Sequence, residues 1–285
     1  MIDKNAIWLV TGCSSGLGKA IAQQALQAGY RVVVTARDID AVADLVHAHP
    51  QSAFAVPLDV TDPVQVRAAV ASAEQRFGSV DVLVNNAGYG YLGAIEEGED
   101  EDVRAMFETD VFGLWQMVKA VLPGMRARAR GHVVNISSIG GLTTFAGVGF
   151  YHMAKFAVEA LSETLAKEVA EFGIGVTVVE PGAFRTDFRG RSMKQSKIRL
   201  AAYESTAGKG RDGVLAGHGK QSGDPARGAR AIIAVLEAPR SPLHLVIGGD
   251  ALDLARRKLT ELAGDFDAWE TVTRSTDFPE NERVG

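Results

Sequence analysis

The stretch AIWLVTGCSSGLGKAIAQQALQA, residues 6–28, decides the fold class of this chain. Its first five residues are continuously apolar, which is typical of a strand buried on both faces. A glycine-rich turn at residues 11–18 follows, and a helical pattern then continues to Ala28. A strand, a glycine-rich turn and a helix in this order indicate the phosphate-binding corner of a dinucleotide-binding fold.

Three glycines give this turn its chemistry. They are Gly12, Gly16 and Gly18, a spacing that differs from the common Gly-x-Gly-x-x-Gly. Glycine lets the backbone approach a pyrophosphate closely, and the helix N-terminus presents unpaired N–H groups and a positive dipole end. We therefore expect one group of residues to hold a dinucleotide: Gly12, Ser14, Ser15, Gly16, Leu17 and Gly18. Cys13 is interpreted as a small filler residue, because no histidine or acid is placed to activate it.

Apolar runs and helical patterns alternate along the rest of the chain. The further apolar runs lie at residues 31–36, 52–58, 80–84, 131–138, 175–179 and 244–247. Helical patterns separate them, and the longest, from about residue 100 to 125, is interrupted near Gly113. This alternation predicts an α/β fold of the Rossmann type, a doubly wound, seven-stranded, mainly parallel sheet with helices on both faces in three layers.

The domain organisation is predicted to be simple. We find no repeat or linker, so residues 1–285 are expected to form a single domain. Residues 183–223 combine many glycines with charges and have weak periodicity, which favours a mobile lid over the substrate. A helix is expected to end near Leu262, and residues 265–285, with Trp269 and Phe278, are expected to pack on the body as an extension.

Composition and charge exclude several classes of protein. The net charge is −5 and the pI is about 5.7, which disfavours a nucleic-acid partner. A single cysteine excludes an internal disulfide framework and suits a reducing compartment. No apolar run reaches membrane-spanning length and no signal peptide is present, so we expect a cytoplasmic protein with no membrane partner.

Arg37 is the first residue after the apolar run 31–36, at the position that faces the adenosine ribose in such folds. An acid there accepts a hydrogen bond from the 2′-hydroxyl of NAD, whereas an arginine pairs with the 2′-phosphate of NADP. The two preceding residues are not acidic, which favours NADP(H) as the cofactor. NAD(H) stays possible because Asp38 follows immediately, although Asp38 has a competing role as the N-cap of a helix over 39–46.

Two more apolar runs end in polar residues. Asp59 and Val60 follow the third run and are expected to contact the adenine, with helix capping as the alternative role of the acid. Asn85 and Asn86 with Ala87 and Gly88 close the fourth run, which suits hydrogen bonds at the sheet end and close approach of a cofactor ribose. We therefore predict cofactor contacts at Asp59, Val60, Asn86, Ala87 and Gly88.

A proton-transfer group is predicted around Tyr151. Lys155 lies four residues further on, about one helical turn, so the phenol and the ammonium project from the same face. Ser138 lies at the carboxyl end of the preceding apolar run, where ligands bind in open α/β sheets. An adjacent lysine favours the phenolate by its charge, so we expect it to lower the phenol's pKa from about 10.

These motifs together resemble those of the short-chain dehydrogenase/reductase family, over roughly residues 5–250. The resemblance implies a bound nicotinamide dinucleotide and hydride transfer between it and an alcohol or carbonyl. It implies that Tyr151 is the general acid or base, that Lys155 binds the nicotinamide ribose, and that Ser138 binds the substrate oxygen. It further assigns Pro181, Gly182 and Thr186 to the nicotinamide, together with Tyr151 and Lys155 as cofactor contacts. The general look of the chain is similar to the steroid- and retinol-type carbonyl reductase branch of the family.

Asp110 departs from the family pattern, which usually has an asparagine there as a fourth catalytic residue. In the family that residue's backbone carbonyl is thought to hold a water, so activity is expected to persist with aspartate. The apolar loop 139–150, with Phe145, and the lid are expected to line a pocket for a hydrophobic ketone, aldehyde or secondary alcohol. No metal site is expected, because the histidines show no ligand spacing.

Three alternatives stay open from the sequence alone. The enzyme could be an NAD-linked dehydrogenase that acts oxidatively on alcohols. A sugar-nucleotide epimerase or dehydratase shares the Tyr-Lys pair but has a larger C-terminal substrate region. A non-catalytic dinucleotide sensor has no physical need for Ser138, Tyr151 and Lys155 together. The resemblance also implies a homo-oligomer, a dimer or tetramer formed through the long helices.

Overall fold

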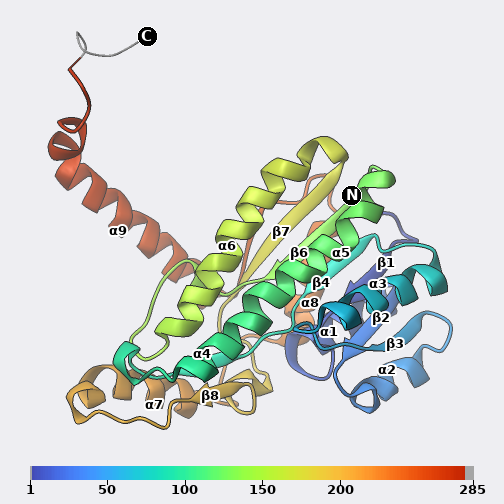
Figure 1. Cartoon of the computed structure of the whole chain (residues 1–285), viewed down its shortest axis with the longest axis horizontal. Helices are drawn as coiled ribbons and strands as arrows, with labels where there is room; N and C mark the ends of the chain where they lie inside the picture. Colours follow the sequence, from blue (N-terminus) through green and yellow to red (C-terminus); the bar gives the residue numbers. More distant parts are fainter. Residues whose placement is uncertain (1, 280–285) are drawn as a thin grey trace.

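A seven-stranded sheet forms the centre of the molecule (Figure 1). The computed structural model describes residues 2–279. The strand order is β3-β2-β1-β4-β6-β7-β9, and each neighbouring pair is parallel. The predicted doubly wound, seven-stranded fold is confirmed. Its strands are β1 (Ile7–Val10), β2 (Arg31–Ala36), β3 (Ala53–Pro57), β4 (Val82–Asn85), β6 (Gly131–Ile136), β7 (Ile174–Pro181) and β9 (His244–Ile247).

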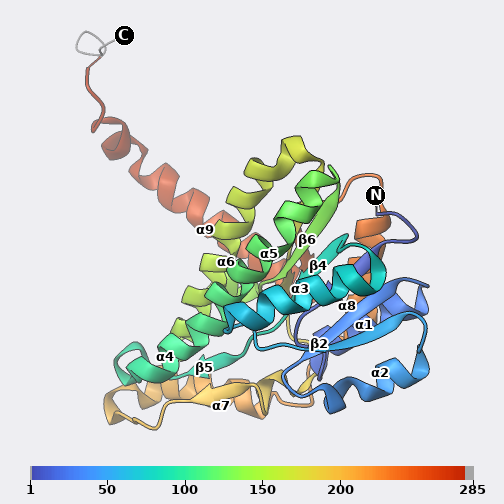
Figure 2. The same cartoon turned by 45° about the vertical axis from the view of Figure 1, so that its right-hand side comes forward.

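Helices cover both faces of this sheet, as two views of the molecule show (Figures 1 and 2). One face packs against α1 (Gly16–Gln27) and α8 (Pro225–Glu237). The other packs against α3 (Pro63–Phe77), α5 (Leu114–Ala127) and α6 (Gly149–Val169). The three predicted layers are therefore present.

The strands are apolar throughout because they are covered on both sides. In β1, Trp8 and Val10 belong to the hydrophobic core of one face, whereas Leu9 belongs to the core of the other. Successive side chains of a strand point to opposite faces of the sheet, so a strand between two helical layers has no polar face. Polar groups gather instead just beyond the strand ends, where the chain leaves the sheet.

The long helix before β6 is interrupted as the sequence predicts. α4 (Asp100–Phe107) runs into a π-helical turn, Glu108–Gly113, and α5 follows directly. A Cβ on Gly113 would lie 2.7 Å from a methyl of Val60, so this position requires glycine. Single π turns inside helices often occur at functional sites, and this one carries the buried Asp110.

The segment 183–223 contains more regular structure than its weak periodicity indicates. Its strand β8 (Met193–Gln195) pairs in parallel with β5 (Gly90–Leu92) in a separate two-stranded sheet, and α7 (Lys209–Ala216) follows. Strands of three residues are too short to show an alternating pattern, so the sequence did not predict this pairing. A Cβ on Gly90 would overlap the Met193 side chain, which explains the close approach of the two strands.

The segment after β2 also differs in detail from its prediction. The expected helix over 39–46 begins as a tight 3₁₀ turn, Ile39–Val42, and only then continues as α2 (Ala43–Ala48). Asp38 caps the turn as predicted, because its carboxylate accepts the Asp40 N–H at 3.0 Å.

The C-terminal helix is longer than predicted and projects away from the body (Figures 1 and 2). α9 spans Gly249–Arg274 rather than ending near Leu262, because its apolar residues keep a helical spacing past that point. Phe266 is 69% exposed and Trp269 is 65% exposed, so the predicted packing on the body is wrong for this part of the extension. The part of that prediction that concerns residues 280–285 lies outside the described residues. Over residues 2–279, none of the helices has the length and apolar character that crossing a bilayer requires.

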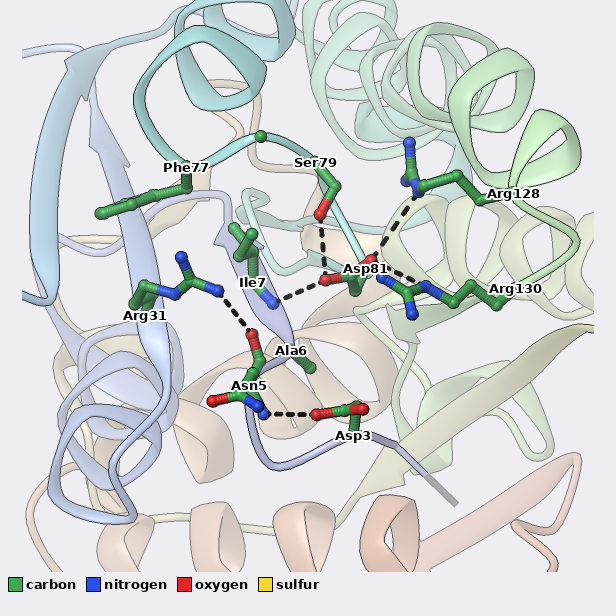
Figure 3. Close-up of a pocket in the computed structure, with 11 residues that line it drawn as sticks. Asp3, Asn5, Ala6, Ile7, Arg31, Phe77, Ser79, Asp81, Arg128 and Arg130 are labelled. Atoms are coloured by element: carbon green, nitrogen blue, oxygen red, sulfur yellow. Dashed lines mark hydrogen bonds and ion pairs between the residues drawn. The ribbon is translucent and has the colours of Figure 1, made fainter.

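A small polar pocket of about 440 Å³ lies near the start of β1, at the opposite edge of the sheet from the glycine-rich turn (Figure 3). Asp81 accepts hydrogen bonds from the Ile7 N–H at 3.0 Å and the Ser79 hydroxyl at 3.1 Å. Arg128 and Arg130 lie 3.9 Å and 3.7 Å from the same carboxylate. The carboxylate thus joins β1 to the turn before β4 and to the end of α5, so we interpret the pocket as a structural brace.

Candidate active site

One cavity of about 1130 Å³ lies beyond the carboxyl ends of the central strands. It collects nearly all of the predicted site residues, because parallel strands end at the same edge of the sheet. Two are absent from its lining, Gly18 and Asp110, and both lie just behind it. The predicted residues that line it are Gly12, Ser14, Ser15, Gly16, Leu17, Arg37, Asp59, Val60, Asn86, Ala87, Gly88, Ser138, Phe145, Tyr151, Lys155, Pro181, Gly182 and Thr186.

The glycine-rich turn has the geometry of a cradle for an anion. Gly12 and Gly16 have φ values of +70° and +62°, which a residue with a Cβ rarely adopts. A Cβ on Gly18 would overlap the Asn86 side chain, so Gly18 permits close packing rather than ligand contact. Ser15, the N-cap of α1, makes no side-chain capping bond, which leaves the first N–H groups of the helix available for a phosphate. The turn therefore fits the pyrophosphate of a dinucleotide.

Asn86 braces this turn from the end of β4. Its side-chain amide donates to the carbonyls of Thr11 at 3.0 Å and Gly12 at 3.1 Å. The Thr11 hydroxyl in turn accepts the backbone N–H groups of Asn86 at 2.9 Å and Ala87 at 3.0 Å. These bonds fix the start of the glycine-rich turn to the neighbouring strand end, so the side chain of Asn86 positions the cradle.

The adenosine end of the cavity contains the predicted Arg37 and Asp59. Arg37 is exposed and lines the cavity, while its neighbour Asp38 is occupied as a cap. One carboxylate oxygen of Asp59 accepts from the Thr61 N–H at 2.9 Å and the Thr61 hydroxyl at 2.7 Å. The cap of α3 is Asp62, whose carboxylate accepts two backbone N–H groups of the first turn, so the capping alternative for Asp59 is wrong and the residue lines the cavity.

Tyr151, Lys155 and Ser138 converge at the middle of the cavity. Tyr151 and Lys155 are buried on the first turns of α6, and the Lys155 ammonium lies 5.5 Å from the centre of the tyrosine ring. Lys155 also donates to the Ile136 carbonyl at 3.1 Å, which fixes its head beneath the end of β6. Ser138 accepts the Gly140 N–H at 3.0 Å, and its hydroxyl also hydrogen-bonds the Tyr151 phenol.

Burial determines the protonation of Tyr151. It raises the pKa of the phenol, while the charge of Lys155 and the hydrogen bond from Ser138 oppose that shift and Asp110 adds to it. The expected lowering by Lys155 is present, but it is the weaker effect, so the prediction of a net lowered pKa is wrong. The sequence shows the lysine four residues away and does not show that the ring is enclosed. Tyr151 is therefore a protonated phenol at neutral pH, ready to donate.

Asp110 acts through its side chain in this structure. One oxygen of its buried carboxylate lies 3.3 Å from the Lys155 ammonium, and the other accepts the Tyr89 N–H at 3.0 Å. Burial alone would lower the pKa of Lys155, but Asp110 and the Tyr151 oxygen outweigh it and raise it. Burial also raises the pKa of the Asp110 carboxyl, against the charge of Lys155. Asp110 thus forms a side-chain ion pair in addition to the backbone role expected from the family pattern. The carboxylate has room there because residue 88 is a glycine.

The remaining half of the cavity is apolar, and most of its residues come from the loop 139–150 and the segment 183–223, as predicted; the sequence missed Tyr89 and Leu254. Phe188 approaches Tyr151 with 5.6 Å between ring centres, from the segment that was predicted as a lid. Phe145, predicted from the loop 139–150, lies in this half of the cavity. The pairing of β5 with β8 brings Met193 to this part of the cavity. The apolar and aromatic lining residues are Tyr89, Phe145, Val148, Phe184, Phe188, Met193, Val214 and Leu254.

His152 positions the substrate loop rather than exchanging protons. Its Nδ1 lies 2.9 Å from the Gly140 carbonyl, and its Nε2 accepts the Phe145 N–H at 3.0 Å. These partners assign the proton to Nδ1, and burial lowers the pKa of the ring, so it is neutral. The residue next to Tyr151 thus holds both ends of the loop 140–145.

Glu159, Glu180 and His244 form the one group among residues 2–279 whose donor atoms could hold a metal ion. His244 Nδ1 lies 2.8 Å from Glu180 and 3.8 Å from Glu159. The residues come from α6, β7 and β9, so no linear spacing could have revealed them. Burial raises the pKa of Glu159 to about 7 and that of Glu180 to about 8. Protons therefore neutralise much of this buried charge without a metal.

This group predicts a pH-dependent stability. An acid whose pKa is raised by folding stabilises the protein below its unfolded value and loses that contribution as the pH rises to its folded value. Glu180→Gln should therefore match the parent near pH 5 and exceed it by about 2–4 kcal/mol near pH 8.5. Urea denaturation at both pH values measures this difference. Glu163→Gln, at an exposed acid 3.9 Å from the same histidine, is the control and should change the pH dependence far less, because its charge makes only a minor contribution to the raised pKa of Glu159. Parallel curves for the parent and Glu180→Gln would contradict the assignment.

A glycine-rich phosphate cradle and a serine–tyrosine–lysine group in one cavity define a dinucleotide-dependent oxidoreductase. Residues 6–197 match the family model described as short chain dehydrogenase. The chain belongs to the short-chain dehydrogenase/reductase family, as its motifs predict.

Known proteins support this assignment along most of the chain. The oxidoreductase BOA17 of Botryotinia fuckeliana is 38% identical over 94% of this chain and 97% of its own length. The crystal structure of a short-chain dehydrogenase from Streptomyces avermitilis is 46% identical, with a TM-score of 0.89 over 95% of this chain and all of that one. An alcohol dehydrogenase from Thermococcus sibiricus, complexed with 5-hydroxy-NADP, is 27% identical, with a TM-score of 0.71 over 85% of this chain and 95% of that one.

Proposed function

We propose that this protein is an NADP(H)-dependent carbonyl reductase that acts on a hydrophobic ketone or aldehyde. The observation that carries the proposal is the buried Tyr151, a protonated phenol between the phosphate cradle and the apolar half of one cavity. A protonated phenol is the form that donates to the oxygen of a carbonyl during reduction. Oxidation of the matching secondary alcohol is the reverse reaction and requires the phenolate.

Each part of the cavity has a role in this proposal. The bound nicotinamide cofactor supplies the hydride in reduction and accepts it in oxidation. Ser138 hydrogen-bonds the substrate oxygen, and Tyr151 donates its phenolic proton to that oxygen as negative charge develops there. Lys155 holds the nicotinamide ribose and favours the phenolate that is left. Pro181, Gly182 and Thr186 hold the nicotinamide, and the glycine-rich turn holds the pyrophosphate.

The lining of the cavity favours an apolar substrate. Phe145, Phe188 and Met193 surround the space next to Tyr151, and Val214 of α7 closes it from the far side. A pocket with this lining binds a molecule by burying apolar surface, at about 25 cal/mol for each Å². We extend the proposal to the segment 183–223 as a lid, since it supplies these three residues, Phe188, Met193 and Val214.

Arg37 is expected to select NADPH over NADH. The Arg37→Ala variant should lose a preference of about tenfold, or 1.4 kcal/mol, because its guanidinium pairs with the 2′-phosphate. Fluorescence titration with both cofactors at matched ionic strength measures the preference. Arg31→Ala, at a cation outside the cavity, is the control and should keep it. Equal affinity of the parent for both cofactors would instead favour the NAD-linked, oxidative alternative.

The reaction itself is tested by steady-state turnover of NADPH with a series of aromatic and aliphatic ketones and aldehydes. The proposal expects kcat/KM to rise with the apolar area of the substrate. It also expects Phe188→Ala to raise KM for the larger ketones more than for acetone. Turnover of nucleotide sugars, or failure to reduce any carbonyl in the presence of bound NADPH, would contradict the proposal.

A further inference from the structure

Helix α9 carries an apolar stripe, partly buried at the base of the helix and left exposed by the described remainder of the chain at Leu259, Phe266 and Trp269. Successive members of this stripe are three, four, three, four and three residues apart, which places all of them on one face of the helix. Strict three-four spacing is the pattern of a two-helix seam. We call the following residues the α9 stripe: Leu252, Ala255, Leu259, Leu262, Phe266 and Trp269.

Only the base of the helix packs on the body. Ala251, Leu254 and Ala255 contact the loop after β6 through Ile139 and Leu142. Beyond that point Leu259, Phe266 and Trp269 are 68%, 69% and 65% exposed. Residues 256–274 rise about 28 Å as a helix, and they project from the body in both views (Figures 1 and 2). A contiguous apolar surface of this kind marks an interaction site.

The charges along the helix identify the partner. Beyond the acidic first turns of the helix, the basic residues that flank the stripe, Arg256 and Lys258, lie toward its base, and the acidic residues Asp265, Asp267 and Glu270 lie toward its tip. When two copies of α9 pair in antiparallel orientation about a two-fold axis near Leu262, the basic cluster of each faces the acidic cluster of the other. Parallel pairing would place like charges together. The helix is thus complementary to itself in one orientation, as an isologous interface requires.

The existing ion pairs on the helix do not compete strongly with this arrangement. Arg257 lies 3.8 Å from Glu261, and Arg274 lies 2.7 Å from Glu270, each one turn apart on an exposed surface. Such pairs contribute about 0.3–0.5 kcal/mol. The side chains of Arg256, Lys258, Asp265 and Asp267 can therefore give up their contacts with water and pair with charges on a partner helix.

We propose that α9 is a dimerisation arm, in which the α9 stripes of two copies of this chain pack in antiparallel orientation. A lipid surface is the less suitable partner, because interfacial helices carry mainly Lys and Arg on their polar face. Here the tip is acidic. The arm also reaches the active site, since Asp250 at its base accepts the Ala183 N–H at 3.0 Å and Leu254 lines the cavity. Dimerisation therefore fixes the position of α9, and the base of this helix forms part of the active-site wall.

Sedimentation velocity on the full chain, over a range of concentrations, tests the proposal. The double variant Leu259→Glu with Phe266→Glu should raise the dimer dissociation constant by about 30-fold or more, the effect of losing a hot-spot side chain. Val64→Glu, at a side chain of α3 that is 64% exposed, is the matched control and should leave it unchanged. Circular dichroism checks that each variant keeps its helices. A wild-type monomer, or a wild-type oligomer that the double variant retains, would overturn the proposal.

Two charge variants test the orientation. One carries Arg256→Glu and Lys258→Glu, and the other carries Asp265→Lys, Asp267→Lys and Glu270→Lys. Each should be monomeric alone, and a mixture of the two should form heterodimers. No heterodimer in the mixture would overturn the antiparallel arrangement. Flotation of a monomeric wild type with phosphatidylcholine–phosphatidylserine vesicles, abolished in the Leu259/Phe266 variant, would assign the stripe to a lipid surface instead.

Discussion

Replacing Tyr151 with phenylalanine is expected to lower kcat for ketone reduction by about 10²–10⁴-fold, the usual contribution of a positioned proton donor. The variant removes a single oxygen from a buried ring and leaves the packing against Phe188 in place. Affinity for NADPH, measured by fluorescence titration, should change little, because the pyrophosphate is held by the glycine-rich turn. The loss should therefore appear in kcat rather than in cofactor binding.

The pH dependence separates a proton donor from a structural tyrosine. Burial raises the pKa of Tyr151, so its donating form persists across the neutral range. Reduction should be nearly independent of pH there and fall as the pH rises through the phenol's pKa, whereas oxidation should rise with pH. The residual activity of Tyr151→Phe should lose both dependences. Tyr89→Phe removes the equivalent oxygen from another wall of the same cavity and should keep them. A Tyr151→Phe variant with the wild-type pH profile would exclude Tyr151 as the proton donor.

The sequence predicted the fold because each of its signals is local. Every strand between two helical layers must be apolar on both faces, and the runs at residues 6–10, 31–36 and 80–84 have this character. The meeting of Ser138 with Tyr151 and Lys155 also followed from a local rule, since strand ends and the following helix starts meet at one edge of a parallel sheet. Short motifs and the topology of a parallel sheet are therefore enough to predict this part of the site.

The sequence could not predict properties that depend on enclosure or on distant pairing. Lys155 is visible four residues from Tyr151, but the burial that outweighs its effect on the phenol is not. The ion pair of Lys155 with Asp110 joins α6 to a π turn 45 residues earlier in the chain. The place of Met193 in the apolar wall depends on the pairing of two three-residue strands, and the direction of α9 depends on a lack of contacts with the body beyond its base over the described residues 2–279.

Asp110→Ala is expected to destabilise the fold by about 3–5 kcal/mol, because it leaves the Lys155 ammonium buried without its carboxylate. Lys155 is only 6% exposed, and its other hydrogen bond is to the carbonyl of Ile136. Urea denaturation at pH 7 measures this loss. The second effect is on the pKa of Lys155, which burial lowers and Asp110 raises, so the pKa should be lower in Asp110→Ala than in the parent. The activity of Asp110→Ala should then fall as the pH rises, over a range in which the activity of the parent protein is constant.

Asp110→Asn distinguishes the charge from the hydrogen bond. The asparagine oxygen can still accept the Tyr89 N–H, so the turn 88–89 should stay in place and the loss of stability should be smaller than in Asp110→Ala. Its uncharged amide cannot hold the proton on Lys155 as the carboxylate does, so the pH dependence should shift in both variants. An Asp110→Ala protein as stable as the parent would show that the ion pair contributes nothing to the fold. A stable Asp110→Asn enzyme with the parent's pH profile would show that the carboxylate does not set the charge of Lys155, which would leave Asp110 with the backbone role that the family pattern implies.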